Sequence, residues 1–181
     1  MSADSYIIRL AEPDDVRHLP SVERRAGELF RTYMEETGLT PEKLDDVSDF
    51  DELEDARRRN HLWVATTADG LPIAWAMALI LDGLAHLDEI DVLPEHGRQG
   101  VGTRLLETVC QWARDAGYRK ITLSTFRDVP WNRPFYEQRG FRVVDHNALL
   151  PEHRALVAGE AERGLRTDLR VMMERDLTRA P

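Results

Sequence analysis

The segment "DEIDVLPEHGRQGVGTRLLETV", residues 88–109, constrains the fold more than any other part of this sequence. A strand-like stretch ends at Leu93, glycines follow at positions 97, 100 and 102, and a regular helical pattern begins at Val101. Glycine near a helix start costs roughly 0.5–1 kcal/mol relative to alanine, so these glycines indicate that bare backbone is needed there. Together with the strand pattern at 120–126, the segment predicts a right-handed parallel strand–helix–strand crossover over residues 85–126.

The glycine segment also has the local order of an anion-binding site. The first amides of a helix have no partner within the helix, and the helix dipole adds partial positive charge at that end. Glycine lets a bulky anion such as a pyrophosphate approach the backbone closely. The spacing G-x-x-G-x-G differs from both the P-loop and the dinucleotide-binding fingerprint. A tight strand–helix connection without a ligand is the alternative interpretation of the loop by itself.

Strand and helix patterns alternate along the rest of the chain, which predicts a single α/β domain over residues 1–181. Asp69-Gly70 is a strong turn signal and predicts a hairpin between its flanking strands. Asn132 and Gly140 are plausible caps of a short helix. The expected strands are 5–11, 61–67, 72–81, 85–93, 120–126, 141–146 and 169–177. The expected helices are 13–34 with a break near Pro20, 49–59, 101–117, 131–140 and 151–164.

Composition and charge exclude several classes of protein. A net charge of -9 argues against a protein that binds nucleic acid by neutralising phosphates. The longest apolar run, residues 71–81, is too short to span a membrane, and the N-terminus lacks the pattern of a signal peptide. The one cysteine, Cys110, lies on the apolar side of a helix and is expected in the core. A cytoplasmic protein without nucleic-acid or membrane partners fits these features best.

Two motifs together resemble a known family. The stretch "IDVLPEHGRQGVGTRLL", followed about thirty residues later by "NRPFYEQRGF", resembles the GNAT superfamily of acyl-CoA-dependent N-acyltransferases. The resemblance covers residues 60–145 well. It implies an α/β GNAT fold with a mixed, mostly antiparallel sheet and helices on both faces. It also implies that the sheet is splayed at the cofactor site, beside the strand that ends at Leu93.

The resemblance implies acetyl-CoA as co-substrate, held mainly by main-chain groups. Gly100 and Gly102 match the two glycines of the family's loop. Where the family prefers Gln or Arg this sequence has Gly97, and the basic residue, Arg98, comes one place later. The residues that the resemblance assigns to the cofactor are Ile90, Asp91, Val92, Gly97, Arg98, Gln99, Gly100, Val101, Gly102, Thr103 and Asn132.

Tyr136 and Glu89 are the candidate catalytic residues. The ordinary pKa of a phenol, about 10, is close to that of an alkyl thiol, so Tyr136 is suited to protonate a leaving thiolate. Glu89 takes the position of a glutamate that deprotonates the amine in many relatives. The alternatives without a catalytic role are a packed aromatic ring for Tyr136 and a solvated or salt-bridged carboxylate for Glu89. Strand periodicity predicts Glu89 and Asp91 on one face and His86 on the other, together with Asp88.

Several other residues allow two interpretations. Glu23 and Glu28 could select an amine acceptor or belong to a solvated helix face. Trp131 could form a wall of an acceptor pocket or anchor its own loop. His146 and His153 are expected at the surface. The pair His86-x-Asp88 has no further ligand cluster, so no metal site is expected.

The function that these observations predict is transfer of an acetyl group from acetyl-CoA to a primary amine, by direct attack in a ternary complex. The acceptor is expected to be a small amine, and a homodimer is implied only by resemblance. A non-catalytic acyl-CoA sensor on the same fold is the main alternative. A different phosphate-ligand protein, such as a nucleotide-binding module, is the second.

Overall fold

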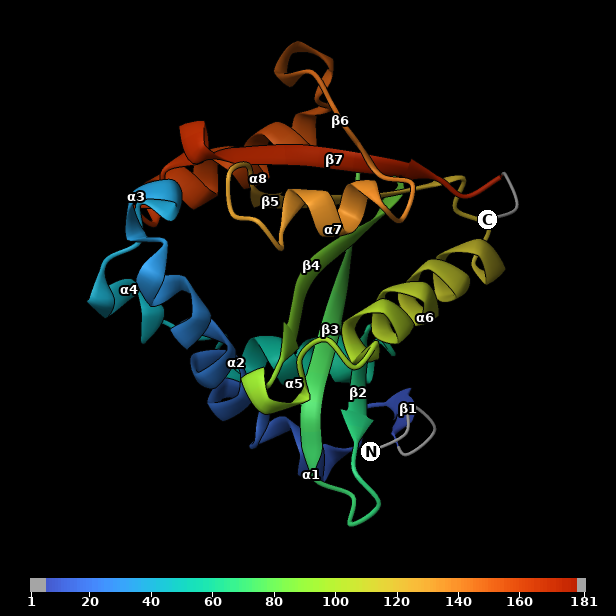
Figure 1. Ribbon diagram of the computed structural model, residues 1–181. Coiled ribbons are helices and arrows are strands. Elements are labelled where there is room, and N and C mark those ends of the chain that lie inside the picture. Colours follow the sequence, from blue (N-terminus) through green and yellow to red (C-terminus); the bar gives the residue numbers. More distant parts are fainter. Residues whose placement is uncertain (1–5, 179–181) are drawn as a thin grey trace.

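One twisted sheet of seven strands organises the chain in the computed structural model, which describes residues 6–178 (Figure 1). The strand order is β1-β2-β3-β4-β5-β7-β6. All neighbouring pairs are antiparallel except β4 and β5, which pair in parallel. The mixed, mostly antiparallel sheet expected from the sequence is therefore confirmed, and so is the parallel pairing across the long helix.

The first half of the chain forms three strands at one side of the sheet and the helices from α1 to α5. Pro20 lies in the first turn of α2, and the break expected near it falls between α1 and α2, because proline favours the start of a helix over its interior. The elements are β1 (Ile7–Leu10), α1 (Pro13–Val16), α2 (Leu19–Gly27), the 3₁₀ helix η2 (Glu28–Thr32), α3 (Met34–Thr37), α4 (Pro41–Leu44), α5 (Phe50–Arg58), β2 (Leu62–Thr66) and β3 (Pro72–Leu81).

The second half carries the glycine segment and completes the sheet. Each helix and strand expected here from periodicity is present, with ends that differ by a few residues. The elements are β4 (Leu84–Val92), η3 (Pro94–His96), α6 (Val101–Asp115), β5 (Lys120–Phe126), α7 (Arg133–Glu137), β6 (Arg142–Val143), η4 (His146–Ala148), α8 (Pro151–Glu162), η5 (Thr167–Leu169) and β7 (Arg170–Asp176).

Helices cover both faces of the sheet because strand side chains alternate between them. The apolar face of α6 packs on β2, β3 and β4, and its Leu105, Leu106 and Cys110 are fully buried, so Cys110 is the core residue that the sequence predicted. Helices α2 and α5 pack against β3 and its neighbours. No helix among residues 6–178 combines the length and the apolar character that crossing a membrane requires.

The sheet opens in its middle, between β4 and β5. Their parallel pairing covers only Ala85–Leu87 opposite Ile121–Leu123, after which the two strands diverge (Figure 1). A β-bulge lies at the same point, because Ala78 of β3 pairs with Leu87 while Met77 pairs with Glu89. A bulge increases the local twist of a strand, which directs the end of β4 away from β5. The opening therefore begins within β4, well before its end.

The bulge corrects one prediction about strand faces. Asp91 and Glu89 pair with Trp75 and Met77, so they share a face as expected. His86 pairs with Leu79, which lies on that same face of β3, so placing His86 on the opposite face was wrong. The extra residue inserted by the bulge shifts the period-two alternation by one position, and no simple strand pattern contains that shift.

A buried polar chain fastens α8 to the closed end of the sheet. His153 Nδ1 lies 2.7 Å from an Asp82 carboxylate oxygen, and its Nε2 lies 3.0 Å from Thr122 Oγ1. Thr122 Oγ1 is in turn 2.8 Å from His86 Nδ1. The expectation that His153 lies at the surface was wrong, since it is 2% exposed, whereas His146 is exposed as expected.

Candidate active site

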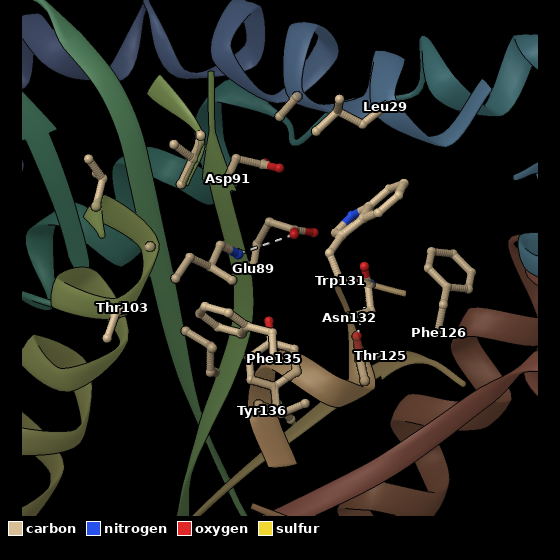
Figure 2. Close-up of a pocket in the computed structure, with 18 of the residues that line it drawn as sticks. Leu29, Glu89, Asp91, Thr103, Thr125, Phe126, Trp131, Asn132, Phe135 and Tyr136 are labelled. Carbon is tan, nitrogen blue, oxygen red and sulfur yellow. Dashed lines mark hydrogen bonds between the residues drawn. The ribbon is translucent and has the colours of Figure 1, made fainter. Parts of the chain in front are cut away.

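A pocket of about 680 Å³ occupies the gap between the diverging strands. One part, here called the loop half, is lined by most residues of the segment 94–103 and by Arg139. The other part, the aromatic half, lies toward α2 and η2. Side chains of β4 and Tyr136 of α7 lie where the two halves meet (Figure 2). The residues that line the aromatic half are Ala26, Leu29, Phe30, Ser124, Phe126, Trp131 and Arg170.

The glycine loop needs glycine at two positions, at Gly100 because of its backbone conformation and at Gly97 because of a close approach. Gly100 has φ +82°, a left-handed conformation that side-chain-bearing residues rarely adopt, and a Cβ there would meet nothing within 4 Å. Gly97 has an ordinary φ, but a Cβ there would lie 3.0 Å from the carbonyl oxygen of Pro94. The first internal bond of α6 joins the Arg104 amide to the Gly100 oxygen at 3.0 Å, so the amides of Val101, Gly102 and Thr103 precede the helix ladder.

Side chains from outside the loop hold it in this shape. The Tyr6 hydroxyl donates to Gln99 Oε1 at 2.7 Å, and Gln99 Nε2 donates to the Glu95 carbonyl at 3.0 Å. Gln99 is therefore turned to Tyr6 and is absent from the pocket lining. The Gly97 amide also bonds internally, to the Pro94 carbonyl at 3.0 Å. The amides after Gly97 are the ones left for a ligand.

Arg139 adds a cation to the loop half. Its Nη2 donates to Thr103 Oγ1 at 2.7 Å and its Nη1 donates to the Phe135 carbonyl at 2.6 Å. The guanidinium also lies 3.7 Å from the centre of the Phe135 ring. These contacts fix a positive charge beside the first turn of α6, a position that the sequence analysis did not single out. The Arg in "YEQRG" was the only signal for it.

The carboxylates of β4 gather at the junction of the two halves. Burial raises the pKa of Glu89 to about 8, and repulsion from Glu23 and Asp88 adds to that rise. Burial likewise raises the pKa of Asp88 to about 6 and that of Asp91 well above its usual range. Asp91 Oδ2 is shielded from solvent and has no hydrogen-bond partner among the described residues. A cation entering this junction would relieve both the repulsion and the unmet hydrogen bond.

Glu23 and Glu28, which the sequence could not tell apart, have different surroundings. Glu23 is half-buried, accepts a hydrogen bond from the Ser48 amide at 2.9 Å, and raises the pKa of Glu89 by repulsion. Glu28 is exposed and pairs with Arg31 at 2.5 Å on the outer surface. Only Glu23 adds to the negative potential of the site.

Tyr136 lies under the carboxylates and is 9% exposed. Its ring makes edge contacts with Phe135 and Phe141 at centroid distances of 5.1 and 5.8 Å. Burial and the charges of Glu89 and Asp91 raise the pKa of Tyr136 above its ordinary value. The phenol therefore stays protonated at any working pH, and it is a weaker acid than an ordinary phenol, on which its predicted role as proton donor was based.

Asn132 and Trp131 shape the far wall of the pocket (Figure 2). Asn132 precedes α7 as expected, but its side chain donates to Thr125 Oγ1 at 3.0 Å instead of capping the helix. Trp131 lines the pocket and also packs edge-on against Tyr33 at a centroid distance of 4.6 Å. Its role as a wall for the acceptor stays a prediction. Phe126 and Arg170 complete this wall and were not singled out from the sequence.

Most of the residues expected in the site do come together in this one pocket. Among the residues expected to bind the cofactor or to act in catalysis, only Gln99 does not line it. The candidates that line the pocket are Glu89, Ile90, Asp91, Val92, Gly97, Arg98, Gly100, Val101, Gly102, Thr103, Asn132 and Tyr136. Their roles in binding and catalysis stay predictions.

A family model described as "Acetyltransferase (GNAT) family" matches residues 26–141. The match spans more than half of the chain, begins at the end of α2, and includes η2, the open part of the sheet, the glycine loop and α7. It thus covers nearly all of the pocket, with Arg170 of β7 beyond its end.

Solved structures share the fold over almost the whole chain at low sequence identity. The PaiA N-acetyltransferase from Thermoplasma acidophilum, in complex with coenzyme A, is 20% identical over 95% of this chain and 99% of its own, with a TM-score of 0.69. The ribosomal-protein-S18-alanine N-acetyltransferase from Escherichia coli is 17% identical over 97% and 96%, with a TM-score of 0.64.

A third similar structure is larger than this chain. The N-acetylglutamate synthase from Neisseria gonorrhoeae, complexed with coenzyme A and N-acetyl-glutamate, is 19% identical over 96% of this chain but only 35% of its own, with a TM-score of 0.71. At these identities the three likenesses establish a shared fold. The descriptions of the second and third name different compounds, the alanine of ribosomal protein S18 and N-acetyl-glutamate.

Proposed function

The chain belongs to the acetyltransferase (GNAT) family, and from this premise we propose that it transfers an acetyl group from acetyl-CoA to a primary amine of a small molecule. The observation that carries the proposal is the opening of the sheet between β4 and β5, with helix-start amides at one end and clustered carboxylates at its centre. We further propose that the chain is a single cytoplasmic domain and that it forms a homodimer.

The loop half fits the diphosphate of acetyl-CoA. The free amides at the start of α6, the open space at Gly100 and the nearby Arg139 together supply donors, room and positive charge. Arg98, in a left-handed conformation with φ +57°, adds a second cation at the rim. When bound, acetyl-CoA supplies the acetyl group as a thioester, which an amine can attack.

The edge of β4 beyond the bulge can hold the rest of the cofactor by main-chain bonds. Beyond Leu87 this edge of β4 is no longer paired with β5, so its peptide groups face the gap. The Ile90 amide donates to the Glu89 carboxylate at 3.1 Å, which supports an orientation of this amide toward the gap. Ile90 and Val92 are therefore the proposed donors to groups of the cofactor, and one of them would stabilise negative charge on the carbonyl oxygen.

Glu89 is the proposed general base. With a pKa of about 8 it is a stronger base than an ordinary carboxylate, and it can take a proton from an ammonium directly or through one water. Tyr136 would hold its proton at the leaving sulfur from the opposite side. Because its pKa is raised, we expect Tyr136 to donate a hydrogen bond first and its proton only as the bond to sulfur breaks.

Direct attack is favoured over a covalent enzyme intermediate. Cys110 is fully buried in the core and is absent from the pocket lining. Burial also raises the pKa of its thiol to about 11, which disfavours the nucleophilic thiolate. The two substrates would therefore be bound at once, one in each half of the pocket.

Calorimetric titration with acetyl-CoA, followed by an assay for thiol release, tests the proposal. We expect binding of acetyl-CoA with a rise in melting temperature, no such rise with ATP or NAD, and release of free coenzyme A with a panel of primary amines. Binding without release for any amine would favour the acyl-CoA sensor. No heat and no stabilisation would contradict the whole proposal.

A further inference from the structure

The aromatic half of the pocket has a chemistry that restricts the acceptor. Phe30 and Phe126 contact at a centroid distance of 5.3 Å, and Phe30 and Trp131 at 6.0 Å. These rings come from η2, the end of β5 and the loop before α7. Trp131 is 38% exposed and Leu29 is 44% exposed at the rim of the same pocket. A group of apolar side chains open to solvent at the mouth of a pocket is suited to an apolar ligand body.

The inner end of this half is acidic. Asp88, Glu89 and Asp91 line the pocket there, and Glu23 adds repulsion from α2. Asp91 Oδ2, buried and without a partner among the described residues, is an unused acceptor at this end. Figure 2 shows Asp91 and Glu89 extending from β4 toward the side of the pocket where Trp131 lies. A ligand with a cation at one end could place that cation at these carboxylates while its other end contacts the aromatic side chains at the rim.

The arginine that lines the aromatic half is already neutralised. Arg170 Nη2 lies 3.1 Å from Glu160 Oε1, and both side chains are largely buried, at 16% and 6% exposure. Its Nε donates to Ser124 Oγ at 3.2 Å, and its guanidinium lies 4.8 Å from the centre of the Phe126 ring. To pair with Arg170, a carboxylate on the acceptor would have to displace Glu160. It would also be repelled by Asp88 and, once ionised, by Glu89.

From this arrangement we propose that the acceptor is a small primary monoamine with an aromatic body and no carboxylate next to the amine. The proposal rests on the acetyltransferase function above and names the substrate class for the same site. The ammonium would lie between Glu89 and Asp91, and the ring would stack against Trp131 and Phe30. Asp91 is thereby assigned a specificity role through its side chain, in addition to main-chain contacts of its strand with the cofactor.

Tryptamine, tryptophan and ethylamine form the test set for the intact protein with saturating acetyl-CoA. Tryptophan adds a carboxylate to tryptamine, and ethylamine removes its ring. We expect kcat/KM for tryptamine to exceed each of the other two by about 100-fold. Spermidine and a short peptide with a free N-terminus complete the set as a polyamine and a macromolecular acceptor.

Two variants check which side chains produce the selectivity. Trp131→Ala should raise KM for tryptamine about 10-fold and leave that for ethylamine unchanged, while Trp131→Phe should restore most of the affinity. Asp91→Asn should lower the tryptamine-to-tryptophan ratio of kcat/KM about 10-fold, because the ammonium of a bound amine stabilises ionised Asp91, which then repels a carboxylate next to that ammonium. Circular dichroism and melting temperature of each variant verify that it is folded.

The outcomes separate this proposal from the function on which it rests. Preference for tryptophan, spermidine or the peptide over tryptamine would overturn the aromatic monoamine and leave the acetyltransferase in place. A tryptamine-to-tryptophan ratio that Asp91→Asn does not change would remove Asp91 from the assignment. If acetyl-CoA binds but no amine releases coenzyme A, both the substrate class and the enzymatic function are wrong.

Discussion

The two halves of the pocket are built from different chemical groups: main-chain amides in the loop half and side chains in the aromatic half. The loop half uses backbone amides of one continuous segment, shaped by Gly97 and Gly100 and held by Tyr6. The aromatic half uses side chains from η2, β4, β5, the loop before α7, and β7. A site made of local backbone is recognisable as a motif, whereas a site made of distant side chains exists only once the sheet has formed. The same contrast predicts which variants affect one half alone.

The largest expected effect is on the loop half. Gly100→Val should weaken acetyl-CoA binding about 1,000-fold, because a branched side chain is placed where the diphosphate meets several amides. Isothermal titration calorimetry measures this loss. The matched control is Gly117→Val at the other end of α6, where φ is +87° and the space around a Cβ is equally open.

Both glycine variants should lose similar stability, since each forces a branched residue into a left-handed conformation. Chemical denaturation measures that shared cost. Equal loss of cofactor affinity in Gly100→Val and Gly117→Val would show that the loop acts only through stability, and the contrast between the halves would fail.

Tyr136→Phe tests the junction between the halves. We expect the turnover number to fall about 100-fold, with acetyl-CoA affinity and amine KM changed less than about threefold, because the ring still packs on Phe135 and Phe141. Steady-state kinetics with calorimetry separates these quantities. Tyr118→Phe, on a ring that packs against Trp112 and does not line the pocket, is the control. Unchanged turnover in Tyr136→Phe would reduce Tyr136 to a packing residue.

Glu89→Gln tests the carboxylate centre through pH. In the free enzyme Glu89 is ionised only above its pKa of about 8, so kcat/KM should rise toward an alkaline plateau with an apparent pKa near 8. The variant should lose about 100-fold at pH 9 but only about 10-fold at pH 7, where little Glu89 is ionised. The rate profile from pH 6 to 9.5 measures this. If kcat/KM of Glu89→Gln still rose with pH with the same apparent pKa, the base would be another group.

The smallest effect concerns the stability of the ligand-free protein. The folded-state pKa of Glu89 is raised, so the folded protein holds this proton more tightly than the unfolded chain does. Its contribution to stability is complete below the unfolded pKa and is lost as the pH rises through about 8. Relative to Glu89→Gln, the protein should lose about 1 kcal/mol between pH 7 and pH 9.

Urea denaturation at the two pH values measures this difference, and taking it relative to the variant cancels the histidines. Saturating acetyl-CoA should leave the pH dependence in place if the loop half is independent of the carboxylates. A parallel loss of stability in both proteins would mean that Glu89 is not the group that titrates.

The sequence by itself determined the elements, the family's loop and the expected cofactor. Periodicity predicted the seven strands and the longer helices, because burial of one face imposes a repeat of two or 3.6 residues. The short helices α3 and α4 were not predicted. The spacing of Gly97, Gly100 and Gly102 marked the loop because backbone conformation and close approach are local requirements. The GNAT resemblance, carried by this loop and by "NRPFYEQRGF", was then confirmed by a family match over residues 26–141.

Tertiary structure alone decided the faces of β4 and the chemistry of the aromatic half. The bulge after Leu87 places Glu89 on the same face as His86. A bulge of this kind has no distinctive residue pattern, so it could not be predicted from the sequence. Arg170 could not be identified as neutralised until β7 placed it beside Glu160 of α8. The identity and charge type of a residue are given by the sequence, but its solvation and its partners depend on segments far away in the chain. Solvation and partners together determine which acceptor a pocket can bind.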